Sequence, residues 1–370
     1  MLLTHQRVVV ERGSRSGLPI VVAVHSTVLG QAIGGCRLTH YADWRDGLDD
    51  ALRLSAAMTE KAALAGLPHG GGKTVIALPP GTVLDEPGRR AVLHDAGDVI
   101  ARLGGTYATG PDVGTGPADM ETIGERTPYV FCRPAATGGS GDSSPHTAAG
   151  VLAALRAVAA ERFGSPDLAG RSFAVLGLGR VGSHVLRLLT EAGGHVITAD
   201  VDESRRAVAE QHGATWTDPD SCLTAEVDVL VPAALGGLLT PATVPRLACS
   251  AIAGPANNQL AGVSRPANNQ LAGVSGPAGN VPGTARLLHE RGILWAPDVV
   301  VSAGGIVHAI AAELHRESAV QIAARIDGIG ETLAGILRAA RETGCTPAES
   351  ASRLATFLLG ERAVPAMAAC

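Results

Sequence analysis

The sequence predicts an α/β protein with two domains. Its 370 residues are more than a single hydrophobic core usually organises. Stretches of strand and helix character alternate in both halves of the chain. A stretch rich in proline, glycine and serine at 133–146 separates the halves, and we interpret it as a hinge. The expected domains are 1–136, completed by C-terminal helices at 325–370, and 147–315.

The composition is that of a well-packed globular chain. Hydrophobic residues make up 46% and charged residues 18%, with a net charge of −5, which argues against a disordered chain. No basic tract suggests a nucleic-acid partner. No apolar run is long enough to cross a bilayer, and the N-terminal residues lack a signal-peptide pattern. We therefore expect a cytoplasmic protein without nucleic-acid or membrane partners.

The cysteines predict neither disulfides nor a metal site. They are scattered, with no CxxC pair and no spacing typical of metal ligands. We interpret them as reduced thiols of a cytoplasmic protein. They are Cys36, Cys132, Cys222, Cys249, Cys345 and Cys370.

The N-terminal half carries its own strands and helices. β-branched residues predict a strand within 18–30 that runs into a turn. Apolar positions recur near the helical period from 44 to 65, and Gly66 is expected to end this helix. The further expected elements are strands at 70–78 and 105–114 and a helix at 118–126.

The C-terminal half alternates strands with helices, which predicts a parallel, doubly wound sheet. A helical tail follows, in which Thr346 and Glu349 have the spacing of a capping box. Strands are expected at 172–176, 195–200, 227–232, 250–254 and 299–305, and helices at 147–162, 181–192 and 203–211.

A glycine motif indicates a dinucleotide site. GLGRVG (177–182) follows an expected strand and opens an expected helix, and a second strand ends at Asp200, 23 residues after Gly177. The helix N-terminus can bind the pyrophosphate, and Asp200 can accept hydrogen bonds from ribose hydroxyls and repel a 2′-phosphate. This favours NAD over NADP, while the alternative is a glycine turn without a ligand. The predicted loop residues are Gly177, Gly179, Arg180, Val181 and Gly182.

Two lysines are candidates for the chemistry. Lys61 ends the expected helix, and Lys73 follows three glycines 12 residues later. If both face one cleft, repulsion and desolvation could leave one partly neutral and able to act as a base. Asp112, in a glycine-rich loop after a strand, could pass protons. The alternatives are two surface lysines and a turn aspartate.

Seven segments resemble the leucine/valine/phenylalanine dehydrogenase family, which lies in one superfamily with glutamate dehydrogenase. They occur in the family's order along most of the chain. They are GGCR (34–37), MTEKAALAGLPHGGGKTVIALP (58–79), TGPDVGTGPADM (109–120), GGSGDSS (138–144), GLGRVG (177–182), PANNQL (255–260) and GILWAPDVVVSAGG (292–305).

The resemblance implies a reversible reaction in which an L-amino acid, NAD and water give a 2-oxo acid, ammonium and NADH. It implies that Lys61 holds the substrate carboxylate, that Lys73 activates the water and that Asp112 shuttles protons. The implied fold is an N-terminal α/β substrate domain and a Rossmann-like doubly wound dinucleotide-binding domain, separated by a cleft. A homo-oligomer is typical of the family.

The same resemblance implies further site residues. Gly34 and Gly35 match glycines beside the substrate, and Thr147 matches a residue near the nicotinamide. Asn257 and Asn258 match an asparagine pair that holds nicotinamide and substrate.

The implied side-chain pocket involves Ile33, Gly110, Ile306 and Ala309. Ile33 stands where the glutamate branch has a lysine, so a substrate side-chain carboxylate would be costly to bury there. The two isoleucines favour valine or leucine as the substrate. One methylene group changes the binding free energy by only ~1–3 kcal/mol, so the sequence does not distinguish valine from leucine. Gly110 and Ala309 are small and leave an aromatic amino acid as the alternative.

Two departures from the family leave other functions open. Glu60 replaces an apolar or tyrosine residue beside Lys61, and Ser302 replaces the asparagine of the family's NAGG segment. A non-catalytic NAD-binding homologue is therefore a second hypothesis. A hydroxy-acid dehydrogenase is a third, although it would more naturally use a His/Arg pair.

One decapeptide occurs twice, at Pro255–Ser264 and at Pro266–Ser275. The first copy directly follows an expected strand, whose carboxyl end faces ligands in such folds. We therefore predict that Asn257 and Asn258 are functional and that Asn268 and Asn269 belong to an inserted surface loop. The alternative is that the second copy enters the site.

Overall fold

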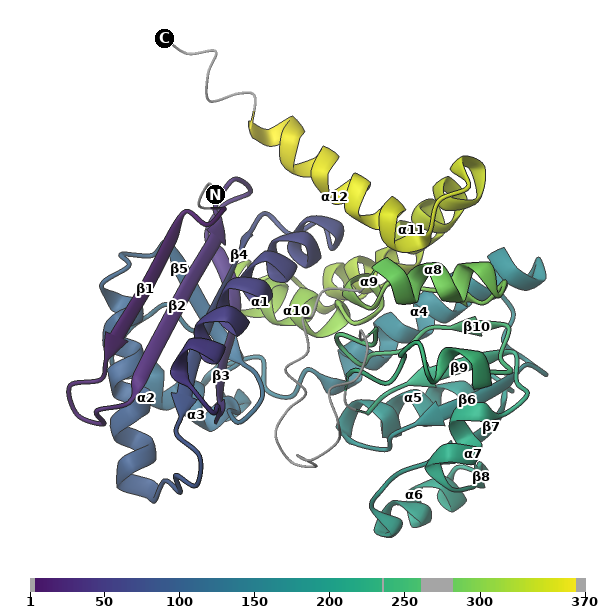
Figure 1. The fold of residues 1–370 in the computed structure, drawn as a ribbon, viewed down its shortest axis with the longest axis horizontal. Helices are drawn as coiled ribbons and strands as arrows, with labels where there is room; N and C mark the ends of the chain where they lie inside the picture. The colour runs from purple at the N-terminus through teal and green to yellow at the C-terminus, as the bar shows by residue number, and fades with distance from the viewer. Residues whose placement is uncertain (1–3, 235, 261–281, 364–370) are drawn as a thin grey trace.

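The computed structural model describes residues 4–234, 236–260 and 282–363 (Figure 1). It confirms a mixed α/β chain of two domains, each built on its own sheet. The two sheets lie on opposite sides of the molecule in Figure 1, with α10 (Gly304–Ala309) between them.

The N-terminal sheet has the strand order β1-β2-β4-β3-β5. Strand β2 pairs antiparallel with β1 and β4, whereas β3 pairs parallel with β4 and β5. The elements are β1 (Arg7–Arg12), β2 (Pro19–Ser26), β3 (Ala32–His40), α1 (Trp44–Leu64), β4 (Gly70–Leu78), α2 (Glu86–Ala101), β5 (Tyr107–Pro111) and α3 (Pro117–Gly124).

The glycines that open β4 let other parts of the chain approach its backbone. A Cβ on Gly71 would lie 2.1 Å from the backbone nitrogen of Thr59 in α1, and one on Gly70 would lie 1.8 Å from the carbonyl oxygen of Ser26. Only glycine fits such contacts. The glycine run therefore lets the C-terminal part of α1, which carries Lys61, lie directly on the start of β4.

The C-terminal sheet is parallel throughout, in the order β11-β10-β9-β6-β7-β8. The chain changes direction between β6 and β9, which makes this the switch point where doubly wound sheets bind ligands. The strands are β6 (Ser172–Leu176), β7 (His195–Ala199), β8 (Thr215–Trp216), β9 (Val229–Pro232), β10 (Ala251–Ile252) and β11 (Leu294–Trp295). The helices of this half include α4 (Ser144–Phe163), α5 (Arg180–Glu191), α6 (Arg206–Gln211), α7 (Pro219–Thr224), α8 (Pro282–Glu290) and α9 (Asp298–Val301).

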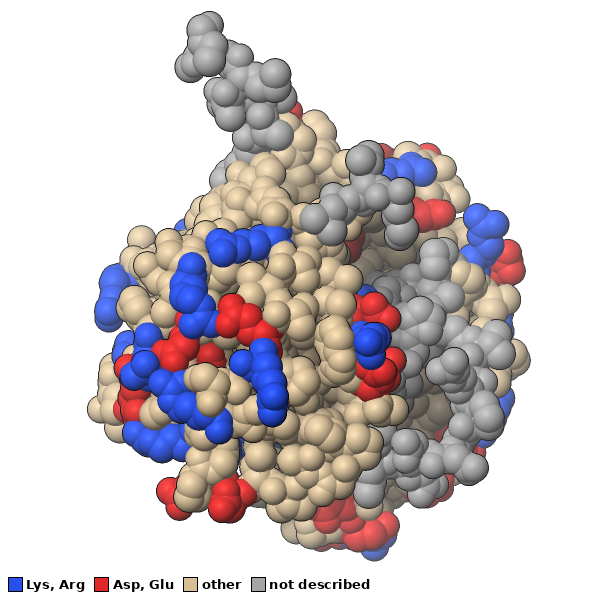
Figure 2. Space-filling model, turned by 60° about the vertical axis from the view of Figure 1, so that its left-hand side comes forward, with Lys and Arg blue, Asp and Glu red and all other residues tan. Residues whose placement is uncertain are grey.

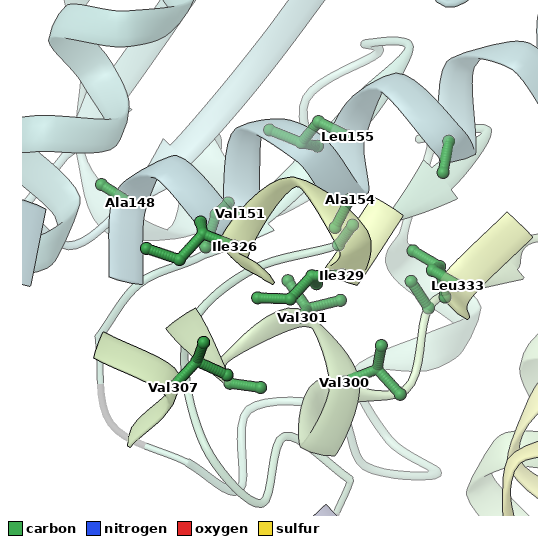
Figure 3. Packing of buried hydrophobic residues seen from close by; sticks show 14 of the residues in the cluster. Ala148, Val151, Ala154, Leu155, Val300, Val301, Val307, Ile326, Ile329 and Leu333 are labelled. Carbon is green, nitrogen blue, oxygen red and sulfur yellow. The ribbon is translucent and has the colours of Figure 1, made fainter. Parts of the chain in front are cut away.

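The predicted strand at 299–305 is wrong. The last strand is β11, and the chain then forms α9 and, from Gly304, α10. Three consecutive valines suggest a strand, but Val300 and Val301 are buried among helices α4 and α11 (Figure 3). Tertiary packing decides the conformation here. The structure also contains β1, β3 and α2, which the sequence analysis did not predict.

The largest buried cluster joins α4, α9 and α10 to α11 (Ala319–Thr343). In Figure 3, Val151 of α4 lies near Ile326 of α11, and Ala154 lies near Ile329. Helix α12 (Pro347–Ala363) contacts both α1 and α11. Its capping box forms as expected, because Glu349 Oε2 accepts from the Thr346 backbone and the Thr346 hydroxyl accepts from the Glu349 backbone.

The surface carries charges of both signs. Lys, Arg, Asp and Glu side chains are interspersed on the face turned forward in Figure 2. Within the described residues, no helix is long and apolar enough to cross a membrane.

Candidate active site

The centre of the candidate site is an ion pair on the N-terminal sheet. Lys73 lies in β4 and is only 5% exposed, and its Nζ is 2.7 Å from Asp112 Oδ2. Asp112 directly follows β5, two strands away in the sheet. Arg37 of β3, the strand between them, donates from Nε to the same oxygen at 2.9 Å. Three neighbouring strands thus bring one carboxylate and two cations together.

The electrostatics of this group keep Asp112 ionised. Burial alone would raise the pKa of the Asp112 carboxyl, but Lys73 and Arg37 outweigh it and hold that pKa well below its usual range. Arg37 is itself held by Asp50, whose Oδ2 accepts from Nη1 at 2.7 Å. Sequence reasoning gave no role to Arg37, although it is the last residue of the GGCR segment.

Lys61 is held differently, by neutral groups of the C-terminal domain. Its Nζ donates to Asn257 Oδ1 at 2.9 Å and to Ser302 Oγ at 2.8 Å. Among the described residues, no carboxylate lies within 4.0 Å of this ammonium. Within the part of the chain that the structure describes, Lys61 is therefore a cation without an ion-pair partner.

This lack of a counter-charge is reflected in the pKa of Lys61. Burial lowers that pKa to about 8, and Lys73 lowers it as well, whereas Asp298 and Asp112 raise it. An incoming carboxylate would supply the missing negative charge.

Two glycines of β3 make room for this arrangement. A Cβ on Gly35 would lie 2.6 Å from Asp112 Cβ and 3.1 Å from Lys73 Nζ, in the space beside the ion pair. A Cβ on Gly34 would lie 1.8 Å from the carbonyl oxygen of Gly72. Gly35 therefore borders the reactive groups, whereas Gly34 allows close approach of β4.

The predicted pocket residues gather in one apolar region. Ile33 and Ala309 are fully buried in the same cluster, and Ile306 packs against it. Gly110 pairs with Gly35 across β3 and β5, and a Cβ on it would lie 2.4 Å from the ring of Phe131. Ile33 and Ile306 thus provide aliphatic surface, here called the aliphatic wall, and Gly110 lies beside Gly35, which borders the ion pair.

The glycine loop fits a dinucleotide. Gly177 has a φ of 106°, and a Cβ on Gly182 would lie 2.0 Å from the Gly177 carbonyl oxygen. No described residue lies within 4 Å of a Cβ on Gly179, at the N-cap of α5, so this helix end can accept a phosphate group. The Asp200 carboxylate accepts from the Leu178 backbone at 2.6 Å. Asp200 therefore lies at the loop, as the motif predicts.

The remaining predicted cofactor residues lie near this loop or at the start of α4. Arg180 is mostly exposed, with Nη1 3.8 Å from Asp142 Oδ1, and Val181 packs against the main apolar cluster. The Thr147 hydroxyl would lie 2.6 Å from a Cβ on Gly305. Glycine at this position thus lets α10 pack against the first turn of α4.

The described part of the first decapeptide copy, 255–260, follows β10 and is held in place by Gln259. The Gln259 amide nitrogen donates to the carbonyls of Gly254 and Ala256, and Trp295 donates to its oxygen at 3.1 Å. Asn258 adopts a positive φ of 55°, which asparagine tolerates. These contacts shape the turn that directs Asn257 to Lys61. The second copy, with Asn268 and Asn269, lies outside the described residues.

Three functional side chains went unnoticed in the sequence: Arg37, Gln259 and Asp298. The Asp298 carboxylate accepts from the Gln259 backbone at 2.9 Å, so it ties the asparagine loop to α9. Gln259 and Asp298 lie in the segments quoted for the resemblance, but their contacts join distant parts of the chain. Glu60 forms no ion pair with Lys61; it lies near Ser352 of α12, and burial raises the pKa of its carboxyl. No cluster of three metal-ligating side chains occurs within the described residues.

Two family models match this chain. The dimerisation domain of the Glu/Leu/Phe/Val dehydrogenases matches residues 2–129. The NAD-binding domain of the D-isomer-specific 2-hydroxyacid dehydrogenases matches residues 149–243. The second match covers only the cofactor domain.

Full-length relatives agree with the first match. The chain is 38% identical to a valine dehydrogenase of Streptomyces coelicolor, over 96% of this chain and 93% of that protein. It is 37% identical to a leucine dehydrogenase of Geobacillus stearothermophilus, over 95% and 89%. The structure of L-tryptophan dehydrogenase from Nostoc punctiforme matches with a TM-score of 0.78 and 34% identity, over 97% of both chains.

The fold and site define a dehydrogenase that uses a nicotinamide cofactor. The chain belongs to the Glu/Leu/Phe/Val dehydrogenase family and is an amino-acid dehydrogenase, an oxidoreductase.

Proposed function

We propose that the protein catalyses the NAD-dependent, reversible oxidative deamination of a branched-chain L-amino acid to its 2-oxo acid and ammonium. The observation that carries this proposal is that Lys61, a half-buried ammonium, has only neutral hydrogen-bond partners within the described residues and is close enough to Lys73 and Asp112 for their charges to shift its pKa. An α-amino acid offers a carboxylate to the first cation and an amino group to the second centre.

Each charged group then has one task. Lys61 binds the substrate carboxylate and so fixes the Cα atom. Asp112 accepts a proton from the substrate ammonium, and the bound nicotinamide supplies a hydride acceptor for Cα. With the Lys73 amine neutral, water adds to the resulting iminium carbon and gives one proton to Lys73 Nζ, which lies 2.7 Å from Asp112 Oδ2. Asp112 returns its proton to the nitrogen of the carbinolamine. As the C–N bond breaks and ammonia leaves, the hydroxyl group becomes the oxo group and gives its proton to Asp112.

Asp200 supports NAD as the cofactor. Its carboxylate lies at the glycine loop after β7, where it would bind ribose hydroxyls and repel a 2′-phosphate. The nearby arginines do not provide an unpaired phosphate site: Arg205 pairs with Asp202 at 3.5 Å and Arg206 with Glu203 at 3.3 Å.

The aliphatic wall supports a branched-chain substrate. Ile33 and Ile306 favour aliphatic side chains, and the named relatives act on valine or leucine. An aromatic substrate is the second candidate, because the similar solved structure is a tryptophan dehydrogenase. We also propose that the protein works as a homo-oligomer, since the matching N-terminal model describes a dimerisation domain.

A substrate panel tests the proposal. We expect NADH formation, followed by absorbance at alkaline pH, to give the highest kcat/KM with valine or leucine and lower values with phenylalanine and tryptophan. NAD should be preferred to NADP. A panel led by phenylalanine or tryptophan would overturn the branched-chain assignment. No turnover with any amino acid would instead favour the non-catalytic homologue.

Paired variants distinguish which copy of the decapeptide lies in the site. We expect Asn257→Ala to lower kcat/KM by about tenfold or more, because it removes the hydrogen bond from Lys61 Nζ to Asn257 Oδ1. Asn268→Ala, the same change in the second copy, should leave kcat/KM unchanged. Loss of activity in the second variant alone would assign the site to the second copy.

A further inference from the structure

Ser302 lies where the two domains meet at the candidate site. It follows α9, is 8% exposed, and its Oγ is 2.8 Å from Lys61 Nζ, 2.6 Å from the Asp298 carbonyl oxygen and 3.1 Å from Asn257 Oδ1. A serine hydroxyl has one proton to donate and lone pairs to accept with. Because an ammonium can only donate, Ser302 accepts from Lys61 and gives its own proton to one of the two oxygens.

We infer that Ser302 is a positioning residue, which holds the Lys61 ammonium across the domain boundary in the charged form that binds the substrate carboxylate. This inference deepens the proposed function and rests on it for the identity of the carboxylate. Lys61 belongs to α1 of the N-terminal domain, whereas Ser302 and Asn257 belong to the C-terminal domain. Both bonds therefore connect the domains.

The geometry leaves one N–H group of the Lys61 ammonium available to a ligand. An ammonium has three N–H groups. Two of them are directed at Asn257 and Ser302, and no third acceptor contacts Nζ within the described residues. A carboxylate that accepts the third N–H meets an ammonium whose direction is already fixed, so less side-chain freedom is lost on binding.

Ser302 also opposes the forces that neutralise Lys61. Four effects act on the pKa of this ammonium. Burial and Lys73 of β4 disfavour the charged form, whereas Asp298 of α9 and Asp112 after β5 favour it. Neither carboxylate lies within 4.0 Å of Nζ in the described structure, so the two neutral acceptors make the only direct contacts there. Removal of one acceptor removes a bond made to the charged form and shifts the balance toward the neutral amine.

The test measures the protonation of Lys61 directly, in the full-length protein. Brief acylation with trace acetic anhydride between pH 6 and 10, with peptide mass spectrometry, gives the pH at which half of the Lys61 side chains are reactive amines. In the wild-type protein this midpoint is expected at about 8. Ser302→Ala and the near-isosteric Ser302→Cys, whose thiol is a weak acceptor, should each lower it by about one pH unit.

A matched serine controls for packing. Ser350 is also buried, and its hydroxyl donates to a helical carbonyl, that of Ile336, at 3.0 Å. Ser350→Ala should leave the Lys61 midpoint unchanged. Steady-state kinetics supply a second readout. Both Ser302 variants should raise the amino-acid KM by about tenfold, with a smaller effect on kcat. In the pH profile of kcat/KM, the alkaline limb should move to lower pH.

The inference is overturned if the Lys61 midpoint in both Ser302 variants equals that of the wild type. It is also overturned if Ser350→Ala produces the same shift. Acylation needs no turnover, so this outcome is separate from failure of the proposed function, which would appear as a wild-type protein that oxidises no amino acid.

Discussion

Replacing Lys73 by methionine is expected to lower kcat by about 10²–10⁴-fold, the range that a positioned acid–base group contributes. Methionine has a similar length and keeps the apolar contacts of a residue that is 5% exposed in β4. It removes the amine that pairs with Asp112, whose Oδ2 lies 2.7 Å from Nζ. Water addition to the imine would then lose its proton acceptor.

Steady-state kinetics with the best amino acid measure this loss. NADH binding, followed by fluorescence, should be retained, because the glycine loop lies in the other domain. Lys61→Met is the comparison variant: we expect it to raise the amino-acid KM by at least about tenfold, through loss of a charged hydrogen bond. A kcat of Lys73→Met equal to that of the wild type would exclude Lys73 from the chemistry.

Replacing Gly71 by alanine is expected to destabilise the protein by about 1–3 kcal/mol and to lower kcat/KM as well. The added Cβ would lie 2.1 Å from the Thr59 nitrogen, 2.4 Å from its hydroxyl and 2.5 Å from the Ser55 carbonyl oxygen. Two of these atoms are helix backbone, so α1 must move away from β4. That movement shifts Lys61 relative to Lys73.

Thermal unfolding measures the first effect, as a lower Tm. Gly328→Ala in α11 is the matched control, because an added Cβ there has no described residue within 4 Å. Alanine is favoured over glycine in a helix interior by about 0.5–1 kcal/mol, so this variant should keep or raise the Tm. If Gly71→Ala unfolds like Gly328→Ala, close contact of α1 with β4 is not what requires the glycine.

Local signals predicted the elements whose conformation is decided locally. The glycine run and the β-branched residues after it define β4 at Gly70–Leu78, the predicted bounds. The helix from Trp44 is apolar on one face and ends just before Gly66, whose φ is 65°. Both predictions are confirmed because strand and helix there follow from periodicity and from glycine conformation.

Where packing overrides local preference, the sequence was misleading. Val299–Val301 has the composition of a strand, yet it forms part of α9 in a core shared with α4 and α11. The edge strand β1, RVVVER, lacks a regular alternation of apolar and polar residues, so it gave no strand signal.

The candidate site shows the same limit. Lys61, Lys73 and Asp112 were candidates from the sequence, and the structure brings them together. Which lysine has a carboxylate partner could not be predicted, because it depends on contacts between residues far apart in the chain. Arg37 reaches Asp112 across 75 positions, and Lys61 reaches Ser302 across 241.

A crystal structure of the enzyme with NADH and a branched-chain 2-oxo acid tests most directly whether Lys61 binds the carboxylate and Lys73 acts at the reacting carbon. We expect the carboxylate of the acid within about 3 Å of Lys61 Nζ, and its carbonyl oxygen at hydrogen-bond distance from Lys73 Nζ. A carboxylate bound to Lys73 instead, or an acid that contacts neither lysine, would contradict the proposed roles.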